Sequence, residues 1–226
     1  MIKKILDLQR QLGIVNAILF AINRILTLLP FSFKVIKFYF AAQKLSNQSL
    51  LPNNRGKNIA IIEVARTEKH HPCPRPIEVI EDRYYQGAIC LVAYNNTEFS
   101  GCLWYIKDRY KEDEVNCLFE LPEKDSVWDF DVYVEPKFRL SPVFLKLWDY
   151  TSDRLLKEDC HWSLSRISAF NPNSLFSHKR MGAVIIGWAV FICLGGIQVT
   201  IANVSPFFHV SFRKASFPIF RLKPPE

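Results

Sequence analysis

The chain has 226 residues, 49% of them hydrophobic and 14% aromatic, which is enough to bury a full core of ordinary size. The formal net charge of +7 favours an acidic or phosphorylated partner, but the Lys and Arg residues are scattered and form no basic stripe with interleaved aromatics, so no nucleic-acid binding is expected. Six cysteines without any C-x-x-C pair indicate reduced core residues of a cytoplasmic protein, with neither a disulfide framework nor a zinc site.

Residues 1–29 predict one amphipathic helix that ends before Pro30. Its apolar side chains recur at spacings of three and four and form one stripe: Ile5, Leu8, Leu12, Val15, Leu19, Ile22, Leu26 and Leu29. Either this stripe packs on the rest of the chain, or it is a membrane-surface helix, a homodimer seam or one wall of a tunnel for a long acyl chain. Asn and Arg residues interrupt the apolar window at 12–31, so no membrane-spanning helix is predicted, and the run lacks the cleavage site of a signal peptide.

An aromatic-rich segment, residues 31–45, follows the first helix, and residues 46–58 are polar with Pro and Gly, as in a linker. We therefore expect a helical N-terminal extension over residues 1–52. A second domain over residues 53–226 would then begin with the apolar strand at 59–65.

The middle of the chain predicts a loop, a helix and a hairpin. Residues 70–76 contain three prolines and are a surface loop, since their His and Cys residues have no partner pair at metal-ligand spacing. Residues 77–86 form a short helix, and residues 88–96 and 99–107 form a hairpin across a turn-rich tetrad. Residues 112–122 are a further strand. Their acidic cluster, Glu112-Asp113-Glu114, is either its solvated start or a holder of a cationic acceptor amine.

A longer pattern runs from Val127 to Ala183. It contains a strand (127–134), the corner Glu135-Pro136-Lys137-Phe138-Arg139, a helix (140–158), a strand (161–170), Asn171-Pro172 and a short helix (175–183). This order resembles the GNAT superfamily of acyl-CoA-dependent N-acyltransferases. The family pattern is V-x-P-x-[YF]-R, a glycine-rich phosphate loop, a helix, a strand ending in Asn, and a helix closing with [YF]-x-[KR]-x-G-[FA]; about a quarter of the chain matches it.

The resemblance implies an α/β fold with a mixed, strongly bent sheet flanked by helices. It also implies that the strand at 127–134 diverges from its neighbour and offers backbone groups to the pantetheine arm of the acyl donor, while Asn171 binds the arm or an ordered water. An ordinary role for Asn171, as the cap of a helix, is compatible with this. The donor-binding residues implied are Val132, Tyr133, Val134, Arg139, Leu140, Ser141, Val143, Phe144, Asn171 and Ser174.

The phosphate loop departs from the family pattern [RQ]-x-x-G-x-[GA]. After Arg139 the chain has Leu140, Ser141, Pro142, Val143 and Phe144, so both glycines are missing, and Pro142 has no N–H to donate. Proline is acceptable in the first turn of a helix, but the anion cradle is weakened. Three explanations remain open: the donor is acyl carrier protein, which has no pyrophosphate; CoA is bound poorly; or the site is not catalytic.

The proton-transfer groups are less clearly marked. His178 stands four residues before Gly182, where the family commonly places the Tyr that protonates the leaving thiolate; alternatively it is an ordinary surface histidine. Strand alternation puts Asp129, Asp131 and Tyr133 on one face, so Asp131 or Asp129 is a candidate general base. The alternative is a structural pair of these aspartates with Arg166, with water relaying the proton. No metal is expected.

The last quarter of the chain is largely apolar. Residues 183–202 predict two buried strands with a bend at Gly195-Gly196. The tail at 205–226 is aromatic and basic, and it either covers the acyl end of a cleft or caps the core.

We therefore expect an N-acyltransferase. It would move an acyl group, medium or long rather than acetyl, from a CoA or acyl-carrier-protein thioester to an amine of a small molecule or peptide, by direct attack. Some GNAT-like enzymes attach fatty acyl groups to ribosomally made peptides, and this chain resembles them. The alternatives are a non-catalytic GNAT-like scaffold that binds an acyl carrier or protein partner, and a peripheral membrane protein held by residues 1–29. A cytoplasmic location, with or without membrane association, and a homodimer are compatible with each.

Overall fold

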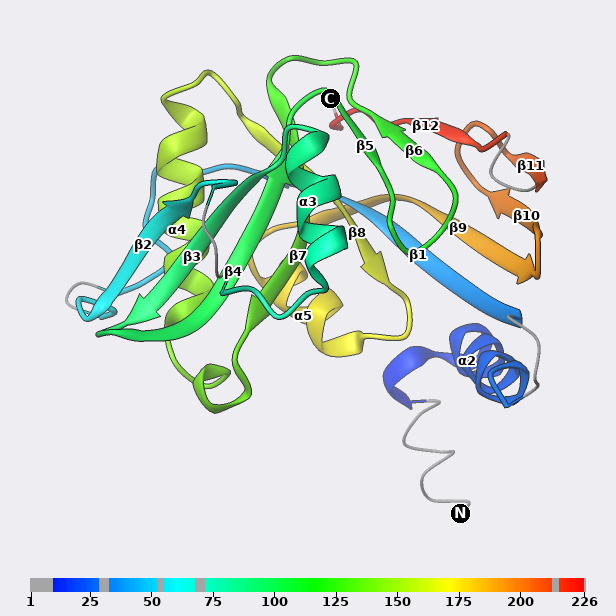
Figure 1. The fold of residues 1–226 in the computed structure, drawn as a ribbon, viewed down its shortest axis with the longest axis horizontal. Coiled ribbons are helices and arrows are strands. Elements are labelled where there is room, and N and C mark those ends of the chain that lie inside the picture. Colours follow the sequence, from blue (N-terminus) through cyan, green and yellow to red (C-terminus); the bar gives the residue numbers. More distant parts are fainter. Residues whose placement is uncertain (1–9, 29–32, 53–54, 68–71, 213–215, 226) are drawn as a thin grey trace. The chain divides into compact units, whose positions relative to one another are not determined.

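The computed structural model describes residues 10–28, 33–52, 55–67, 72–212 and 216–225. The chain divides into two compact units, and Figure 1 labels their helices and strands. We call residues 1–43, 111–120 and 165–226 the terminal unit, and residues 44–110 and 121–164 the central unit. The division falls within one strand, β8 (Trp162–Ser168), between Leu164 and Ser165.

The central unit contains strands in the order β8-β7-β4-β3-β2, of which the first three residues of β8 belong to it. The pairs β2–β3, β3–β4 and β4–β7 are antiparallel. Its elements are β2 (Ile59–Val64), α3 (Ile77–Tyr85), β3 (Ile89–Asn95), β4 (Glu98–Ile106), β7 (Ser126–Val134), the 3₁₀ turn η1 (Pro136–Phe138) and α4 (Val143–Leu156). Helix α4 connects β7 to β8, which is the crossover that parallel neighbours need.

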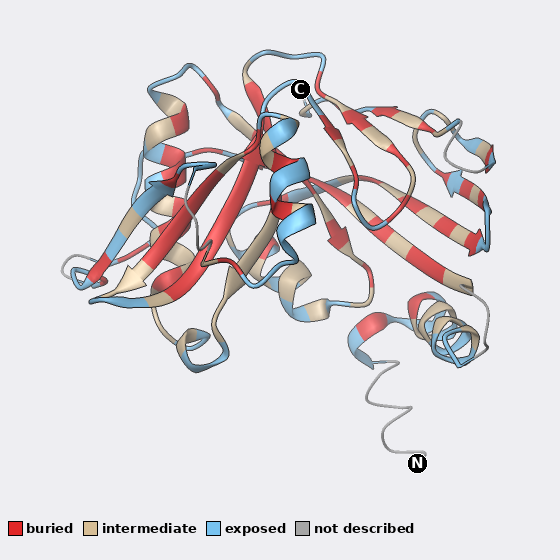
Figure 2. Cartoon of the chain, viewed as in Figure 1, coloured by how far each residue is buried: buried red, intermediate tan, exposed pale blue. Residues whose placement is uncertain are grey.

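Helices α3 and α4 cover opposite faces of the central strands. Tyr84 of α3 packs edge-on against Trp104 of β4, with ring centroids 5.0 Å apart. Three residues earlier along β4, Gly101 faces α4, because a Cβ added there would lie 3.1 Å from a methyl group of Val143. Successive strand residues point to opposite faces, so the two helices lie on either side of β4. Both faces are therefore buried, as the run of fully buried residues along β4 requires (Figure 2).

The terminal unit contains strands in the order β11-β10-β9-β1, followed by the second half of β8. Its elements are α2 (Ile14–Leu26), β1 (Phe33–Lys44), β6 (Leu118–Glu120), α5 (Pro172–Arg180), β9 (Val184–Leu194), β10 (Ile197–Ala202), β11 (Phe208–Phe212) and β12 (Ile219–Arg221). Strand β12 pairs in parallel with β6. The short β5 (Arg109–Lys111) falls at the division, with Arg109 and Tyr110 in the central unit and Lys111 in the terminal unit. The core is aromatic: ring centroids 5.1 to 6.2 Å apart connect Phe38, Phe40, Phe119, Phe191 and Phe220.

The α/β class predicted from the sequence, a mixed sheet with flanking helices, is confirmed. The helix at 77–86, the hairpin at 88–107 and the strand pair around Gly195 also form as predicted. Residues 112–122 form a strand only over Leu118–Glu120. None of the helices in the described part of the chain combines the length and the apolar content needed to cross a bilayer.

The helical extension predicted for residues 1–52 is wrong over Phe33–Lys44, which is the strand β1 paired with β9. Aromatic and β-branched residues dominate this segment and favour a strand that is buried on one or both faces. The boundary between residues 52 and 53 stays a prediction. The predicted apolar stripe is also partly wrong, because Val15 and Ile22 are exposed whereas the polar Asn16 is the buried residue of α2. Ile5, Leu8 and Leu29 lie outside the described residues.

Candidate functional site

The end of strand β7 carries an extra residue. Tyr133 pairs with Cys102 of β4 and Phe130 pairs with Trp104, so two residues of β7 stand opposite the single Leu103. The extra pair is Asp131-Val132, and Asp131 has a left-handed backbone with φ 52°. This is a β-bulge, which leaves backbone groups of the bulged strand outside the ladder and bends that strand.

Gly101 allows β4 to approach the end of β7 closely. A Cβ at this position would lie 2.6 Å from the carbonyl oxygen of Tyr133 and 3.4 Å from Cα of Val134. The first distance is far below van der Waals contact with a backbone atom that has little freedom to move. Glycine is therefore required where the two strands meet, next to the bulge.

Two arginines hold the bulge through Asp131. Nε of Arg75 lies 2.8 Å from Oδ2 of Asp131, and Nη2 of Arg75 donates to Oδ1. Nη1 of Arg83 lies 2.6 Å from Oδ2. The side chain of Arg83 is only 4% exposed, and its guanidinium lies 5.4 and 5.2 Å from the ring centroids of Trp104 and Phe130. Asp131 thus fixes the bend in β7 by joining it to α3 and to the proline-rich loop.

The bulge corrects the predicted face of β7. Asp129, Asp131 and Tyr133 do not share one side, because the extra residue shifts the alternation after Phe130. Asp129 is 2% exposed and accepts a 2.7 Å hydrogen bond from Oγ of Ser163. The two carboxylates therefore lie in different environments, one in the core of the central unit and the other between guanidinium groups.

Arg166, the partner predicted for these aspartates, belongs to the terminal unit and forms other ion pairs. Its Nη2 lies 2.7 Å from Oε1 of Glu112 and 3.2 Å from Oε2 of Glu114. Glu112 is buried, so the solvated start predicted for the acidic cluster is wrong for this residue, whereas Asp113 and Glu114 are exposed. Burial raises the pKa of Glu112, and the nearby Arg166 charge opposes that rise.

The turn after β7 is built from local hydrogen bonds. The N–H of Phe138 bonds the carbonyl of Glu135, and the N–H of Ser141 bonds that of Phe138. Oγ of Ser141 also lies 2.6 Å from the Phe138 carbonyl oxygen, so the hydroxyl is used within the turn. Leu140 is fully exposed, and Nε of Arg139 reaches back to 3.4 Å from the Val134 carbonyl oxygen.

Helix α4 begins directly after this turn. Its first backbone hydrogen bond runs from the N–H of Lys146 to the carbonyl oxygen of Pro142. The N–H groups before Lys146 have no partner within the helix ladder, and such groups at a helix N-terminus can bind an anion. The amide of Val143 lies 3.4 Å from Oγ of Ser141. Pro142 is the N-cap and contributes no donor, so this N-terminus has fewer donors for an anion than a glycine loop would supply.

The side chain of Tyr133 lies over Phe99, with ring centroids 6.3 Å apart and planes 13° apart. Desolvation and the nearby Glu135 carboxylate raise the pKa of the Tyr133 hydroxyl. At neutral pH the hydroxyl therefore keeps its proton and can donate a hydrogen bond.

In the terminal unit, the predicted residues surround the short helix α5. Oδ1 of Asn171 accepts a 3.1 Å hydrogen bond from the N–H of Ser174 and caps the helix, with Pro172 in the first turn. His178 is buried, and burial lowers its pKa from the usual 6.5 to about 4. The surface position that was an alternative for His178 is therefore wrong, and its imidazole is neutral at physiological pH.

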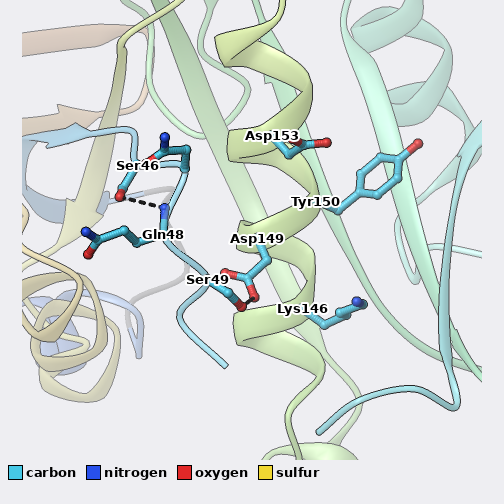
Figure 3. Close-up of a pocket in the computed structure, with 8 residues that line it drawn as sticks. Ser46, Gln48, Ser49, Lys146, Asp149, Tyr150 and Asp153 are labelled. Carbon is cyan, nitrogen blue, oxygen red and sulfur yellow. Dashed lines mark hydrogen bonds between the residues drawn. The ribbon is translucent and has the colours of Figure 1, made fainter. Parts of the chain in front are cut away.

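A separate polar cavity of about 250 Å³ lies beside α4 in the central unit (Figure 3). It is lined by Ser46, Asn47, Gln48, Ser49, Lys146, Asp149, Tyr150 and Asp153. Asp149 points at the loop, where Oδ2 lies 2.6 Å from Oγ of Ser49 and Oδ1 accepts from the N–H of Leu50. The carboxylate is thus used to attach residues 46–51 to α4, and none of the predicted site residues lines this cavity.

The predicted site residues are therefore found in two groups. Ten of them, from Asp129 to Phe144, form the bulged strand, the turn and the helix N-terminus of the central unit; Asn171, Ser174 and His178 belong to α5 in the terminal unit. Arg75 and Arg83 were missed. Arg75 stands in a loop whose sequence is typical of an ordinary surface. The only signal in the sequence was Arg83, on the short helix predicted at 77–86. Among the described residues, no group of three or more His, Cys, Asp or Glu side chains is arranged to hold a metal ion.

No protein-family model matches the chain, and no curated protein is significantly similar to it. Among solved structures, a conserved protein of unknown function from Staphylococcus epidermidis is similar to 76% of this chain over 66% of its own length, at 13% identity and a TM-score of 0.51. This likeness concerns the fold.

Two further solved structures are acetyltransferases. A protein described as a GNAT-family acetyltransferase from Novosphingobium aromaticivorans matches 72% of this chain over 65% of its own length, at 8% identity and a TM-score of 0.46. An aminoglycoside acetyltransferase from an uncultured soil metagenomic sample, in complex with sisomicin, matches 55% of this chain over 87% of its own length, at 11% identity and a TM-score of 0.39. The chain spans just under two thirds of the length of the first two structures.

Proposed function

We propose that the chain transfers an acyl group from a pantetheine thioester to an amine. The observation that carries this proposal is the β-bulge at Asp131-Val132, followed without a break by the end of β7, the turn at 135–142 and the N-terminus of α4. A pantetheine arm has two amides that need backbone partners, and its phosphate needs N–H donors. A bulged strand offers backbone groups to the two amides, and the helix N-terminus that follows offers N–H groups to the phosphate. The two kinds of group follow one another along the chain in the order in which the pantetheine arm needs them.

Within this proposal, the backbone of Val132, Tyr133 and Val134 binds the arm, and Arg139, Leu140, Ser141, Val143 and Phe144 surround the phosphate. Pro142 and the missing glycines favour a donor with a single phosphate, the phosphopantetheine of acyl carrier protein, although CoA remains a candidate donor. The apolar excess of the chain favours a medium or long acyl group, and the acceptor is an amine of a small molecule or a peptide. The proposed location of the protein is the cytoplasm.

The chemical step is a direct attack. The amine nitrogen forms a bond to the thioester carbon, the C–S bond breaks, the amine loses a proton and the thiolate gains one. Both oxygens of Asp131 accept from guanidinium groups and Asp129 is buried, so we propose that water carries the proton away from the amine. The proton-donor role of His178 stays a prediction, and its imidazole is neutral, because about one molecule in a thousand is protonated at pH 7 when the pKa is about 4. We therefore propose that water also supplies the proton that the leaving thiolate gains.

Mass spectrometry of products tests the proposal. The purified chain is incubated with CoA and acyl-carrier thioesters, from acetyl to palmitoyl, and a pool of amines. We expect an acylated amine and a free thiol in equal amounts. Arg139→Ala should raise the donor KM several-fold with little change in kcat, because a phosphate contact is lost. Lys157→Ala, at the far end of α4, is the matched control and should change neither constant.

A non-catalytic scaffold is the second candidate, and the proline at the N-terminus of α4 favours it. The same incubation separates the two functions. Binding of acyl carrier protein or CoA by a folded chain that yields no acylated amine with any donor supports the scaffold and contradicts acyl transfer. Absence of both binding and product contradicts both functions.

A further inference from the structure

Strands β9, β10 and β11 of the terminal unit have an apolar face on which several side chains are exposed in the part of the chain that the structure describes. The antiparallel register places Ile201 opposite Phe208 and Val190, and Ile197 opposite Phe212 and Leu194, so these side chains share one face. The exposed fractions of Ile197, Ile201, Leu194, Phe212 and Phe208 run from 41% to 63%, and Val190 is half-buried. The face comprises Trp188, Val190, Ile192, Leu194, Ile197, Val199, Ile201, Phe208, Val210 and Phe212. We call it the outer face.

The opposite face of the same strands is buried; on β9 it is apolar, with Ala189 and Phe191 at 0% exposure, and on β10 and β11 it carries polar residues. Gln198, Thr200 and Ser211 are 6%, 0% and 1% exposed. Gln198 holds residue 116 from both sides: its Oε1 accepts from the N–H of Asn116, and its Nε2 donates to the Asn116 carbonyl oxygen, each at 2.9 Å. These bonds fix which side of β10 points inward. On β10 the polar Gln198 and Thr200 point inward while Ile197 and Ile201 are exposed, and a slip of one residue would break the bonds.

Helix α2 likewise combines a buried polar residue with several exposed apolar ones. Its buried residue, Asn16, donates a 2.9 Å hydrogen bond to the hydroxyl of Tyr39 and accepts one from Nζ of Lys37. Tyr39 and Lys37 pair with Trp188 and Val190, so α2 lies on the side of the outer face. Leu19, Phe20 and Leu26 of α2 are half-buried, and Phe20 packs edge-on against Phe170. Six other apolar residues of the helix and its C-terminal turn are 40% to 83% exposed: Ile14, Val15, Ile18, Ile22, Ile25 and Leu28. Large apolar patches of this kind mark binding surfaces.

The net charge of the terminal unit indicates which kind of partner binds the outer face and the exposed side of α2. The terminal unit has 14 basic and 6 acidic residues, a net charge of +8, whereas the central unit has 15 basic and 16 acidic residues, a net charge of −1. The positive charge of the chain therefore lies in the unit that exposes the apolar faces. A second copy docked on the same face would bring two units of charge +8 together, which like-charge repulsion opposes. An anionic lipid surface complements both the apolar side chains and the charge.

We propose that the terminal unit binds the surface of anionic phospholipid bilayers through the outer face and the exposed side of α2. The apolar side chains enter the boundary between headgroups and acyl chains, and the surrounding Lys and Arg residues contact lipid phosphates. Lys37, with Nζ 5.4 Å from the ring centroid of Trp188, combines a cation and an aromatic ring of the kind favoured at that boundary. This proposal does not rest on the acyl-transfer activity.

Vesicle co-sedimentation of the full chain tests the proposal. The vesicles are phosphatidylcholine alone or phosphatidylcholine with about 30% phosphatidylglycerol. We expect binding to the mixed vesicles, weaker binding to neutral ones, and a loss as salt is raised. The double variant Ile201→Glu/Phe208→Glu should lower the partition coefficient about tenfold or more, because two apolar side chains are replaced by anions.

Matched controls carry the same change in the central unit. Ile62→Glu in β2 and Tyr85→Glu at the end of α3 alter side chains that are 46% and 81% exposed, and they should leave vesicle binding unchanged. A second test variant, Ile18→Glu on α2, removes one apolar contact without touching the strands. Circular dichroism and thermal unfolding verify that each variant is folded.

Three results would overturn the proposal. The first is a folded wild-type chain that fails to sediment with the mixed vesicles. The second is binding that the controls reduce as much as the Ile201→Glu/Phe208→Glu variant does. The third is a stable dimer, seen by light scattering without lipid, that this variant converts to monomers, since the outer face would then be an interface between two copies.

Discussion

Removing the charge of Asp131 is the sharpest test of how the bulge in β7 is held. Asp131→Asn keeps the shape of the side chain, and asparagine tolerates the left-handed backbone observed at φ 52°. The change leaves the guanidinium of Arg83, which is only 4% exposed, without its carboxylate partner. Breaking a buried pair by removing one member costs about 3–5 kcal/mol. The retained amide oxygen can still accept one hydrogen bond, so we expect a loss of about 2–3 kcal/mol in the free energy of unfolding.

Urea titration followed by tryptophan fluorescence measures this loss. Four of the five tryptophans belong to the central unit, so the signal reports mainly on the unit that contains Asp131. Asp153→Asn is the control: Asp153 pairs with Lys157 on the exposed side of α4, and such a pair contributes under about 0.5 kcal/mol. If Asp131→Asn costs no more than this control, the two arginines do not depend on the carboxylate, and the explanation of the bulge given above is refuted.

Three further predictions concern other buried groups. The pKa of His178 is about 4 in the folded chain against 6.5 in the unfolded chain. Its contribution of up to about 3 kcal/mol to the free energy of unfolding is therefore complete above pH 6.5 and is lost as the pH falls towards 4. When unfolding is followed between pH 4 and 7, this extra acid sensitivity should disappear in His178→Gln. Gly101→Ala should cost about 1–3 kcal/mol in urea titrations, because the new Cβ meets a backbone oxygen at 2.6 Å; a neutral result would mean that the two strands are further apart. Glu112→Gln should cost about 2–4 kcal/mol by leaving Arg166 near a neutral amide, whereas Glu114→Gln, at an exposed carboxylate, should cost under about 1 kcal/mol; equal losses would contradict the burial of the first pair.

The sequence predicted the elements that depend on neighbouring residues. The hairpin of β3 and β4 follows from two apolar runs around a turn whose Asn96 adopts a positive φ, which asparagine tolerates. The helix α5 follows from Asn171-Pro172, a cap and a first-turn proline that act within four residues. Such patterns need no knowledge of the rest of the chain.

Features that depend on distant residues were missed. The bulge in β7 requires Arg75 and Arg83, which are about 50 residues away in the sequence, and no local pattern announces it. The buried side of α2 was predicted only in part, since apolar periodicity alone does not reveal that Asn16 finds partners on β1. The burial of His178 likewise depends on the packing of its unit rather than on residues near it in the chain.

The three-residue arrangement of Asp131, Arg75 and Arg83 also limits how this chain can change over time. Losing Asp131 leaves two guanidinium groups without a carboxylate between them, whereas losing one arginine leaves a neutral pair. Sequences descended from a common ancestor with this protein should therefore keep a carboxylate at the bulge wherever both arginines are present. Sequences with both arginines and no carboxylate should be rare, and this dependence would mark the bulged strand in proteins too divergent to align by overall identity.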